Sequence, residues 1–501
     1  MALQINTNVG ALMASASASS ASKSMATSMN RLATGMRINT AADDAAGVAI
    51  ASRLTSEIRG TNQAVRNAAD GQALIDTAEG AQTEIVNILQ RMRELSVQAA
   101  NDTNSSDDRL ALNDEVEQLT AELDRIADTT TWAGQKLLDG SFVTKTLQIG
   151  ADIGQSLTVS QKSMRAADIG EFKIDTTAVT MAAATTVTNT LLSTGVTVLG
   201  KDGSADAAVT AGASAATLAA AVNTDTSATG VKASAHTAIR FSLSGDPLSQ
   251  TSMTLQGGGS AVNISASVTS KSDLSALLSA VNTYSSTTGV TAEFDGSDKS
   301  KLILREANGD NISITGFAAT AGVAGATKLD AVVEKQTNYE GTGFTTGATL
   351  KTAGNNSTAA TGVVRMSSSN SFTLSGDNAD ATKGYNAGSA TAASSLSKIS
   401  EVSISTQTSA TAAIGVIDTA LGMVSESRAA LGAVSNRLDS TISNLTNISA
   451  NLEAGRSSIQ DADFAAESTN LAKNQILSQA STAMLAQANA SKQGVLQLLQ
   501  G

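Results

Sequence analysis

The stretch LIDTAEGAQTEIVNILQRMRELSVQA, residues 74–99, decides the fold of this chain. Its apolar residues and alanines follow one another in alternating steps of four and three, which is the seam of a left-handed coiled coil. The pattern predicts a long helix that packs lengthwise against other helices. The seam residues are Leu74, Ala78, Ala81, Ile85, Ile88, Met92, Leu95 and Ala99.

The segments on both sides of this helix predict where it begins and how the chain returns. Thr40–Asp43 has the form of a capping box with Asp in place of Glu, so the helix is expected to open there. Residues 101–108 are rich in Asn, Asp and Ser and predict a turn. A second helix with the same rhythm should then return antiparallel to the first. Its seam is Leu112, Val116, Leu119, Leu123 and Ile126.

A third segment near the other end of the chain repeats this spacing. Arg428 and Ser435 interrupt its seam, and Arg428 is expected either to reach solvent or to pair with an acid on a neighbouring helix. The three segments predict one bundle that joins N-terminal and C-terminal parts of the chain. The third seam is Ile414, Ile417, Leu421, Val424, Leu431, Leu438, Ile442, Leu445 and Leu452.

The sequence between these helices changes character. Thr146–Ser160 alternates apolar and polar residues around a glycine-flanked turn and predicts a β-hairpin. From about residue 170 to 395 the chain is rich in Thr, Ser, Ala and Gly, with short β-prone runs. An internal repeat lies here, because the pattern of residues 218–231 recurs at 277–290 with an offset of 59. The repeat predicts a short helix leading into strands, used twice.

The two ends of the chain resemble each other in composition. Residues 1–42 and 468–501 contain no Asp or Glu and carry single apolar residues at helical intervals. Helices with so thin an apolar face bury too little surface to order alone, so they need partners. Both ends therefore predict a protein that assembles.

Composition excludes several functional classes. The net charge of −12 argues against nucleic acid as a partner. The absence of Cys places no demand on the redox compartment, and 2% aromatic residues favour closely packed helices. We expect no cleavable signal at the N-terminus, no stretch approaching a membrane span and no membrane insertion.

No constellation of residues supports catalysis, a cofactor or a metal site. His236 is the one histidine, and we expect it to be an exposed structural residue. Gly257–Gly259 lacks the Lys of a phosphate loop and predicts a turn. The acid pairs at 43–44 and 107–108 are expected to cap helices. We therefore predict a protein that is not an enzyme.

Several motifs resemble bacterial flagellin, over about residues 1–160 and 400–501. The resemblance implies a structural subunit that polymerises into the hollow helical filament of a motility organelle, outside the cell. It also implies export through the flagellar type III channel. With one His, the chain departs from the flagellins that contain a metallopeptidase. The motifs are MALQINTN (1–8), NRLATG (30–35), AADDAAG (41–47), LQRMRELSVQ (89–98), LGAVSNRL (431–438), NQIL (474–477) and AMLAQAN (483–489).

The expected fold is mainly α, a long coiled-coil-like bundle that pairs N- and C-terminal segments and carries an inserted β-rich outer region. The resemblance assigns residues 1–40 and 456–501 to an inner helical domain. It assigns residues 41–170, with the hairpin, and 396–455 to the outer-tube bundle. Residues 171–395 would form the variable, surface-exposed part. The terminal helices would assemble through Leu3, Ile5, Val9, Leu12, Leu477, Met484, Ala488, Val495 and Leu499.

The resemblance also implies partners and a contact surface. Besides further copies of the chain, these are cap proteins, hook–filament junction proteins and an export chaperone at the C-terminal helices. In similar flagellins, residues matching Arg91, Leu95, Gln98 and Glu115 form a patch between subunits, which a Toll-like receptor of animal hosts binds on the monomer. Periodicity alone places Leu95 in the buried seam, so both interpretations of Leu95 stay open.

Two other functions compete with the filament subunit. A hook–filament junction protein has the same kind of terminal helices. A secreted hydrolase with helical anchors is the alternative from another class, and it lacks a catalytic constellation in this sequence.

Overall fold

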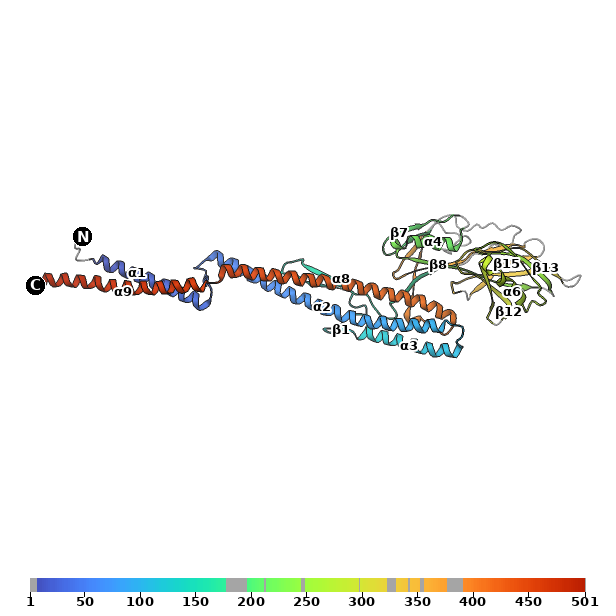
Figure 1. Ribbon diagram of the computed structural model, residues 1–501, viewed down its shortest axis with the longest axis horizontal. Helices are drawn as coiled ribbons and strands as arrows, with labels where there is room; N and C mark the ends of the chain where they lie inside the picture. Colours follow the sequence, from blue (N-terminus) through green and yellow to red (C-terminus); the bar gives the residue numbers. More distant parts are fainter. Residues whose placement is uncertain are drawn as a thin grey trace. The chain divides into compact units, whose positions relative to one another are not determined.

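The computed structural model describes residues 7–176, 196–210, 213–244, 248–296, 298–321, 330–340, 343–351, 356–375 and 391–500. Contacts divide the chain into two compact units. The first comprises Met1–Asp76, Thr144–Ser160 and Leu431–Gly501, and the second comprises Thr77–Val143 and Gln161–Ala430. The predicted combination of long terminal helices with an inserted β-rich region is confirmed (Figure 1).

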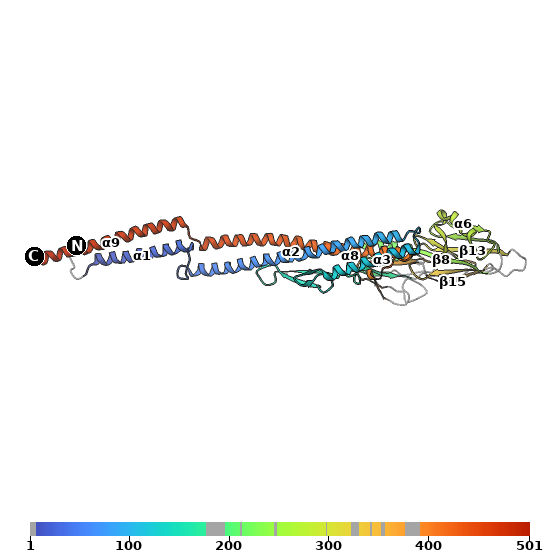
Figure 2. The same cartoon turned by 90° about the horizontal axis from the view of Figure 1, so that it is seen from below.

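The first and last helices of the chain form a pair in the first unit. α1 (Val9–Thr34) begins where the side chain of Asn8 accepts a hydrogen bond from the Ala11 amide, and it ends at Gly35, whose φ of 70° is left-handed. α9 (Phe464–Gln500) lies along α1 in both views (Figures 1 and 2). Asn8 also donates to the Ala488 carbonyl at 3.3 Å, although the two residues are 480 positions apart.

Both helices of this pair break at the same level before the bundle continues. α2 (Ala45–Ala99) and α8 (Gln407–Gln460) adjoin α1 and α9 through short linkers. The Arg37 amide donates to the Gln460 carbonyl at 2.7 Å, and the Ala462 amide donates to the Gly35 carbonyl at 2.9 Å. The two breaks are therefore hydrogen-bonded to each other.

The predicted start of α2 is wrong by a few residues. Asp43 accepts hydrogen bonds from Thr40 and Asn39 within a turn that precedes the helix. Asp44 is the residue that caps α2, because its carboxylate accepts from the Gly47 amide at 2.9 Å. The chain needs the extra turn to pass from α1 to α2.

α2 and α8 run antiparallel within each unit. In the first unit Gln72 donates to Asp439 at 2.8 Å, and in the second Arg93 Nε donates to Asp418 at 2.5 Å. α3 (Ser106–Thr129) follows α2 after the predicted turn and opens with a capping box between Ser105 and Asp108. The three striped segments thus form the predicted bundle.

The seam of α2 is confirmed at Ala78, Ile85, Met92, Leu95 and Ala99. At three other positions the next residue is the buried one: Ile75, Gln82 and Leu89 replace Leu74, Ala81 and Ile88. A straight helix drifts relative to a strict seven-residue repeat, so the buried face shifts along its length. Gln82 could not be predicted from apolar spacing, because it is buried through a hydrogen bond to Ser427 at 3.1 Å.

Arg428 follows the second of its two predicted alternatives. Its guanidinium lies 3.3 Å from the carboxylate of Glu79 on α2. The break in the α8 seam is therefore filled by an ion pair between two helices.

The predicted hairpin is present in the first unit. β3 (Thr144–Gln148) pairs with β4 (Ser156–Ser160), and Leu147 lies opposite Leu157. A Cβ atom at Gly71 of α2 would lie 2.4 Å from the Leu147 side chain. Glycine at this position therefore lets the hairpin lie directly on the helix. A shorter ladder joins β1 (Thr131–Trp132) and β2 (Gln135–Lys136).

The inserted region consists of antiparallel sheets. In the largest sheet the order is β11 (Val290–Asp295), β12 (Asp298–Glu306), β8 (Lys232–Ser244), β17 (Val363–Ser368), β5 (Gly170–Asp175) and β20 (Ser395–Lys398), with β14 (Asp330–Gln336) on β8 and β15 (Phe344–Lys351) on β14. A second sheet has the order β10 (Val262–Ala266), β9 (Leu248–Gln256), β13 (Ile312–Ala321) and β16 (Thr358–Ala360). The third has the order β19 (Thr391–Ala393), β18 (Thr373–Ser375), β6 (Val196–Leu199) and β7 (Ser204–Ala207).

The chain enters and leaves this region through neighbouring strands. β5 pairs with β20, so that Gly170 lies opposite Lys398. The Ile399 amide, in the short 3₁₀ helix Ile399–Glu401, donates to the Ile169 carbonyl at 3.0 Å. The two connections to the helices are thus held together in register.

The internal repeat is confirmed as two copies of one unit. α4 (Ala215–Thr224) and α5 (Thr226–Thr229) lead into β8, and α6 (Ser275–Thr283) and α7 (Ser285–Thr288) lead into β11. Asn223 exchanges two hydrogen bonds with the backbone of Ala233, both at 2.8 Å. Asn282 makes the same pair with Ala292, at 2.9 and 2.8 Å. Each copy packs into its own apolar core.

The prediction that no stretch approaches a membrane span is wrong. α8 contains a window that is long and apolar enough to cross a membrane by length and composition. Its apolar residues include Val416, Ile417, Ala420 and Val424, which are buried. A helix in the core of a bundle is apolar because it packs against other apolar side chains, and a membrane helix is apolar because it contacts lipid.

Candidate assembly surfaces

α1 buries a narrow line of small residues and leaves larger apolar side chains exposed. Of its described residues only Ala21 and Ser28 are buried. Two of the predicted assembly residues, Val9 and Leu12, are 53% and 66% exposed. Met13 and Met29, which the sequence did not single out, are also exposed. The buried residues of α1 are therefore small, and several of its large apolar side chains are exposed to solvent.

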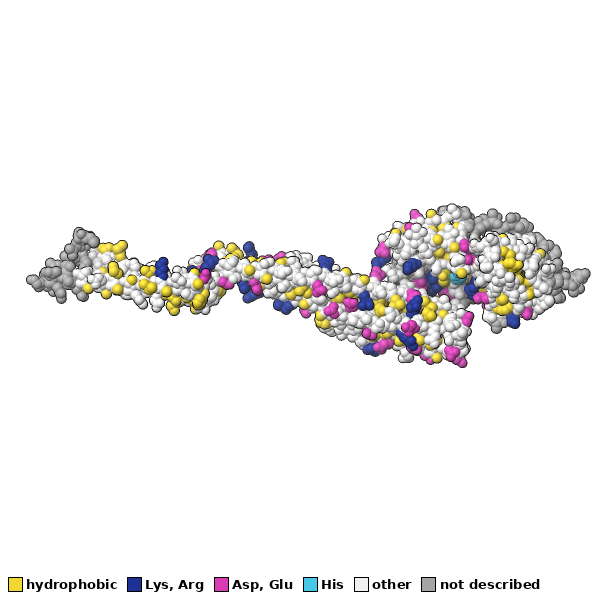
Figure 3. Space-filling model, in the orientation of Figure 1, with side chains coloured by type: hydrophobic (Ala, Val, Ile, Leu, Met, Phe, Trp, Pro, Cys, Tyr) yellow, Lys and Arg dark blue, Asp and Glu magenta, His cyan; other side chains and the backbone are white. Residues whose placement is uncertain are grey.

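α9 has the same division. Leu477 and Met484, both predicted assembly residues, are 45% and 65% exposed, and Ile476 and Phe464 of the same helix are also exposed. Figure 3 shows apolar side chains scattered along this helical pair. Exposed large apolar residues gathered on two paired helices are typical of a protein interface. The α1–α9 pair is therefore a candidate assembly surface.

Of the other predicted assembly residues, the structure describes the side chain of Ala488 alone. Ala488 is half-buried, and its carbonyl accepts the hydrogen bond from Asn8, so it belongs to the contact between α1 and α9. Leu3 and Ile5 lie outside the described residues. The side chains of Val495 and Leu499 also lie outside the described part of the chain.

The predicted patch on the bundle is only partly assembled. Arg91 Nε donates to Glu115 Oε1 at 2.9 Å, which joins α2 to α3, and Gln98 is exposed on α2. Hydrogen bonds from Arg91 to Glu115 and Glu94 raise the pKa of Arg91. Leu95, in contrast, is 1% exposed. The exposed interpretation of Leu95 is therefore corrected: in the single chain it is a core residue.

Two exposed apolar residues that the sequence analysis missed lie on the same two helices. Val97 on α2 is 48% exposed, and Leu110 on α3 is 52% exposed. Neither residue belongs to a predicted seam. Their exposure could have been predicted from this, because an apolar residue outside the seam of an amphipathic helix faces solvent.

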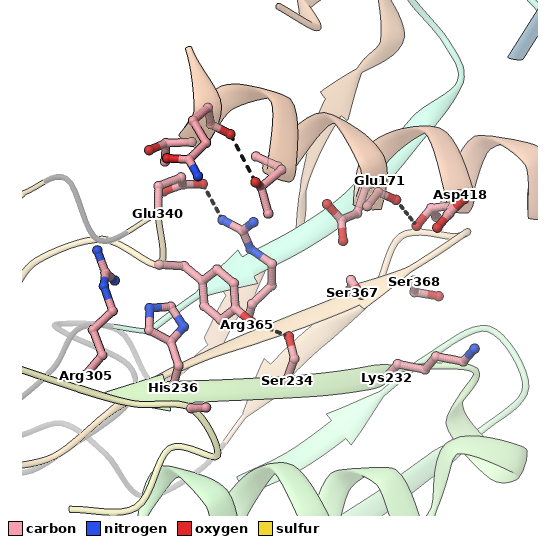
Figure 4. Close-up of a pocket in the computed structure, with 18 of the residues that line it drawn as sticks. Glu171, Lys232, Ser234, His236, Arg305, Glu340, Arg365, Ser367, Ser368 and Asp418 are labelled. Carbon is pink, nitrogen blue, oxygen red and sulfur yellow. Dashed lines mark hydrogen bonds and ion pairs between the residues drawn. The ribbon is translucent and has the colours of Figure 1, made fainter. Parts of the chain in front are cut away.

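A cleft in the second unit lies between the large sheet and α8. It has a volume of about 1010 Å³. Glu171, Arg365 and Glu340 line it together with Tyr339 (Figure 4). Arg365 Nε donates to Asp175 at 2.6 Å, and its guanidinium lies 4.2 Å from the centre of the Tyr339 ring. Burial raises the pKa of the Glu171 carboxyl. Two ion pairs, Arg365 with Glu340 and Arg305 with Glu293, join charged residues of the cleft.

His236 lies in this cleft, so its predicted exposure is wrong. It is half-buried, its ring lies 4.5 Å from that of Tyr339, and its Nε2 is 2.8 Å from the amide nitrogen of Gln336. Burial, followed by the charges of Arg305 and Arg365, lowers its pKa from 6.5 to about 4. His236 is therefore neutral near pH 7, and its ring is held by the contacts with Tyr339 and Gln336. Among the described residues, no group of three His, Asp or Glu is arranged to hold a metal ion.

Family models match both ends of the chain and part of its middle. The model of the bacterial flagellin N-terminal helical region matches residues 5–143, and that of the C-terminal helical region matches residues 414–499. A model of the flagellin hook IN motif matches residues 252–308, which contain the second copy of the internal repeat.

Proteins similar to this chain over its full length are also flagellins. The chain is 40% identical to the B-type flagellin of Pseudomonas aeruginosa and 33% identical to flagellin B of Vibrio cholerae, with 100% of each chain covered in both cases. A solved FliC structure from Burkholderia pseudomallei is 22% identical over 73% of this chain and 99% of that chain, with a TM-score of 0.30. Hook-associated protein-3 of Legionella pneumophila is 13% identical over 81% and 99%, with a TM-score of 0.33.

Proposed function

This chain belongs to the bacterial flagellins and is a structural subunit of the flagellar filament, and from this premise we propose that two surfaces hold its subunits together. The first surface is the α1–α9 pair and the second is the Arg91–Glu115 side of the bundle. The observation that carries the proposal is that α1 and α9 expose large apolar residues and bury very few side chains. Covering those residues with further subunits would supply the stabilisation that each helix lacks alone.

Hydrogen exchange tests the first surface. Residues 9–34 and 464–500 should exchange rapidly in the monomer and slowly in the filament, because α1 and α9 have little buried surface of their own. α2, in contrast, should be protected in both states. Equal protection of α1 in monomer and filament would contradict the proposal.

A pair of substitutions on α9 separates assembly from folding. Met484→Ser removes an exposed apolar side chain and should weaken polymerisation while leaving the unfolding transition of the monomer unchanged. Gln487→Ser changes an exposed polar residue on the same helix and should have no effect on either measurement. Equal polymerisation of the two variants would argue against this surface.

For the second surface we propose that Arg91, Gln98 and Glu115 contact a neighbouring subunit. Their exposure and the ion pair between α2 and α3 support this proposal. We also propose that the Toll-like receptor of animal hosts binds the same surface on depolymerised protein. Arg91→Ala should then reduce both assembly and receptor signalling, whereas Arg125→Ala, which removes another exposed ion pair of α3, should reduce neither.

The division into an inner domain (1–40, 456–501), an outer-tube bundle (41–170, 396–455) and a surface region (171–395) is part of this proposal. The aligned breaks between α1 and α2 and between α8 and α9 support its inner boundary. Limited proteolysis of filaments should therefore cut residues 171–395 first and leave both terminal segments intact.

We further propose export through the type III channel, with a chaperone that covers the exposed apolar face of α9 before assembly. Cap and junction proteins would bind the same terminal helices at the two ends of the filament. We infer that the subunit works without catalysis, and its membership of a family of structural filament subunits supports this. Deleting residues 493–501 should abolish chaperone binding and polymerisation together.

A further inference from the structure

The tip of the β3–β4 hairpin carries a large apolar side chain that the fold does not use. Ile153 has a relative exposure of 104%, the highest of the exposed large apolar residues described. It lies in the turn between the two strands, after Asp152 and before Gly154. An apolar side chain that is entirely in water gains nothing from burial in the monomer, and it would gain if another subunit covered it.

The turn that carries Ile153 is held in one conformation. The side chain of Gln148 donates to the carbonyls of Gly150 and Asp152, at 3.0 and 2.8 Å. The Ile149 amide donates to the Gln155 carbonyl at 3.0 Å, and Gly154 has a φ of 88°. The isoleucine is thus presented on a preorganised tip, which lowers the entropic cost of binding.

A groove with an apolar part lies in the same unit of the chain. It has a volume of about 470 Å³, within the range of about 300–1,000 Å³ typical of binding pockets. Ile38, Val48 and Ala51 form its apolar part, and Ser52 and Arg59 are exposed at its sides. Arg59 makes no ion pair with any acid of the described residues.

The hairpin of a chain does not fill that chain's own groove. Its Ala151 lies against α2 at Gly60, where an added Cβ would come within 2.9 Å of the Ala151 side chain. With Ala151 seated on α2, Ile153 points into solvent and stays fully exposed. A projection and a cavity at different places on one molecule are the two halves of a heterologous contact, the kind that builds an open helical filament when its rotation does not close.

We propose that the hairpin tip of one subunit, Asp152 and Ile153, docks into the groove formed by Ile38, Val48, Ala51, Ser52 and Arg59 of a second copy of this chain. Ile153 covers the apolar part of the groove, and Asp152 supplies the carboxylate that Arg59 lacks. This contact rests on the proposed filament function and adds to it an interface that involves neither the α1–α9 pair nor the Arg91 surface.

Cysteine cross-linking tests the contact directly, because the chain has no Cys of its own. In filaments assembled from the full-length Ile153→Cys/Ser52→Cys variant, oxidation should produce a ladder of disulfide-linked oligomers. The control is Ile153→Cys/Ser443→Cys, since Ser443 is exposed on α8 outside the groove, and it should give no ladder. If the first variant forms normal filaments but oxidation produces no disulfide-linked oligomers, the docking proposal is overturned.

Seeded polymerisation measures the strength of the contact. Ile153→Ser should raise the critical concentration about tenfold to hundredfold, which is the effect of losing the burial of one isoleucine. The melting temperature of its monomer should not change. Ile448→Ser, at an exposed isoleucine of α8 outside the groove, should leave the critical concentration unchanged. Equal critical concentrations for Ile153→Ser and the parent would overturn the contact, whereas a parent chain that never polymerises would overturn the filament function itself.

Discussion

Leu95 and Val97 are two residues apart on α2, and their environments are opposite. Leu95 is 1% exposed and Val97 is 48% exposed. We predict that Leu95→Ala lowers the free energy of unfolding of the monomer by about 2–5 kcal/mol, because it leaves a cavity in the bundle. Val97→Ala should change it by less than about 0.5 kcal/mol. Chemical denaturation of both variants gives the comparison, and an unchanged Leu95→Ala midpoint would show that this position is not core.

His236 predicts a dependence of stability on pH. Its pKa of about 4 in the folded chain is below its usual 6.5, so the unfolded chain takes up a proton at a higher pH than the folded chain. The free energy of unfolding should therefore decrease as the pH falls from about 6.5 towards 4. His236→Gln removes this contribution, so calorimetry between pH 7 and pH 4.5 should give a shallower decrease. Identical slopes for variant and parent would contradict the assignment.

These two residues also mark the limits of what the sequence predicts. The spacing around Leu95 predicts the buried seam correctly, since a helix repeats its geometry locally. The environment of His236 depends on Tyr339, in the turn after β14, and on Arg365 of β17, both more than 100 positions away in the sequence. No local pattern contains that information.

At the scale of elements, the two repeat units provide a matched experiment. Asn223 and Asn282 each hold a helix to the following strand through two backbone hydrogen bonds. We predict that Asn223→Ala and Asn282→Ala each destabilise the inserted region by about 1–3 kcal/mol, because buried backbone groups lose their partners. Asn447→Ala, on the exposed face of α8, is the control. A large effect in one copy and none in the other would show that the two units are not equivalent.

The sequence predicts these elements unequally. The helices, the hairpin and the doubled unit follow from periodicity and offset, and the structure confirms them. The strand order of the large sheet could not be predicted, because β8 pairs with β12, β14 and β17, which are far from it in sequence. The two interpretations of Leu95 could not be separated by sequence, because Leu95 lies in the seam beside the exposed Arg91 and Gln98; in the single chain Leu95 is buried.

At the scale of the molecule, the pairing of β5 with β20 makes the inserted region separable. The chain enters at Gly170 and leaves at Lys398, which lie opposite each other. We predict that replacing residues 176–390 with a short flexible linker leaves polymerisation intact, since the closing entropy of a linker grows slowly with its length. Electron microscopy after seeding would test this. Loss of filaments from a monomer whose α2 and α8 remain folded would contradict it.

The hydrogen bond between Asn8 and Ala488 joins residues 480 positions apart, and this fixes an order of events in time. Contacts between residues close in sequence, such as the β3–β4 hairpin, can form as soon as their own segment is free. The α1–α9 pair can form only after both ends of the chain have emerged from whatever confines it. A chain that emerges one end first would therefore form the α1–α9 pair last, and until then it would lack the surface proposed to join it to other subunits.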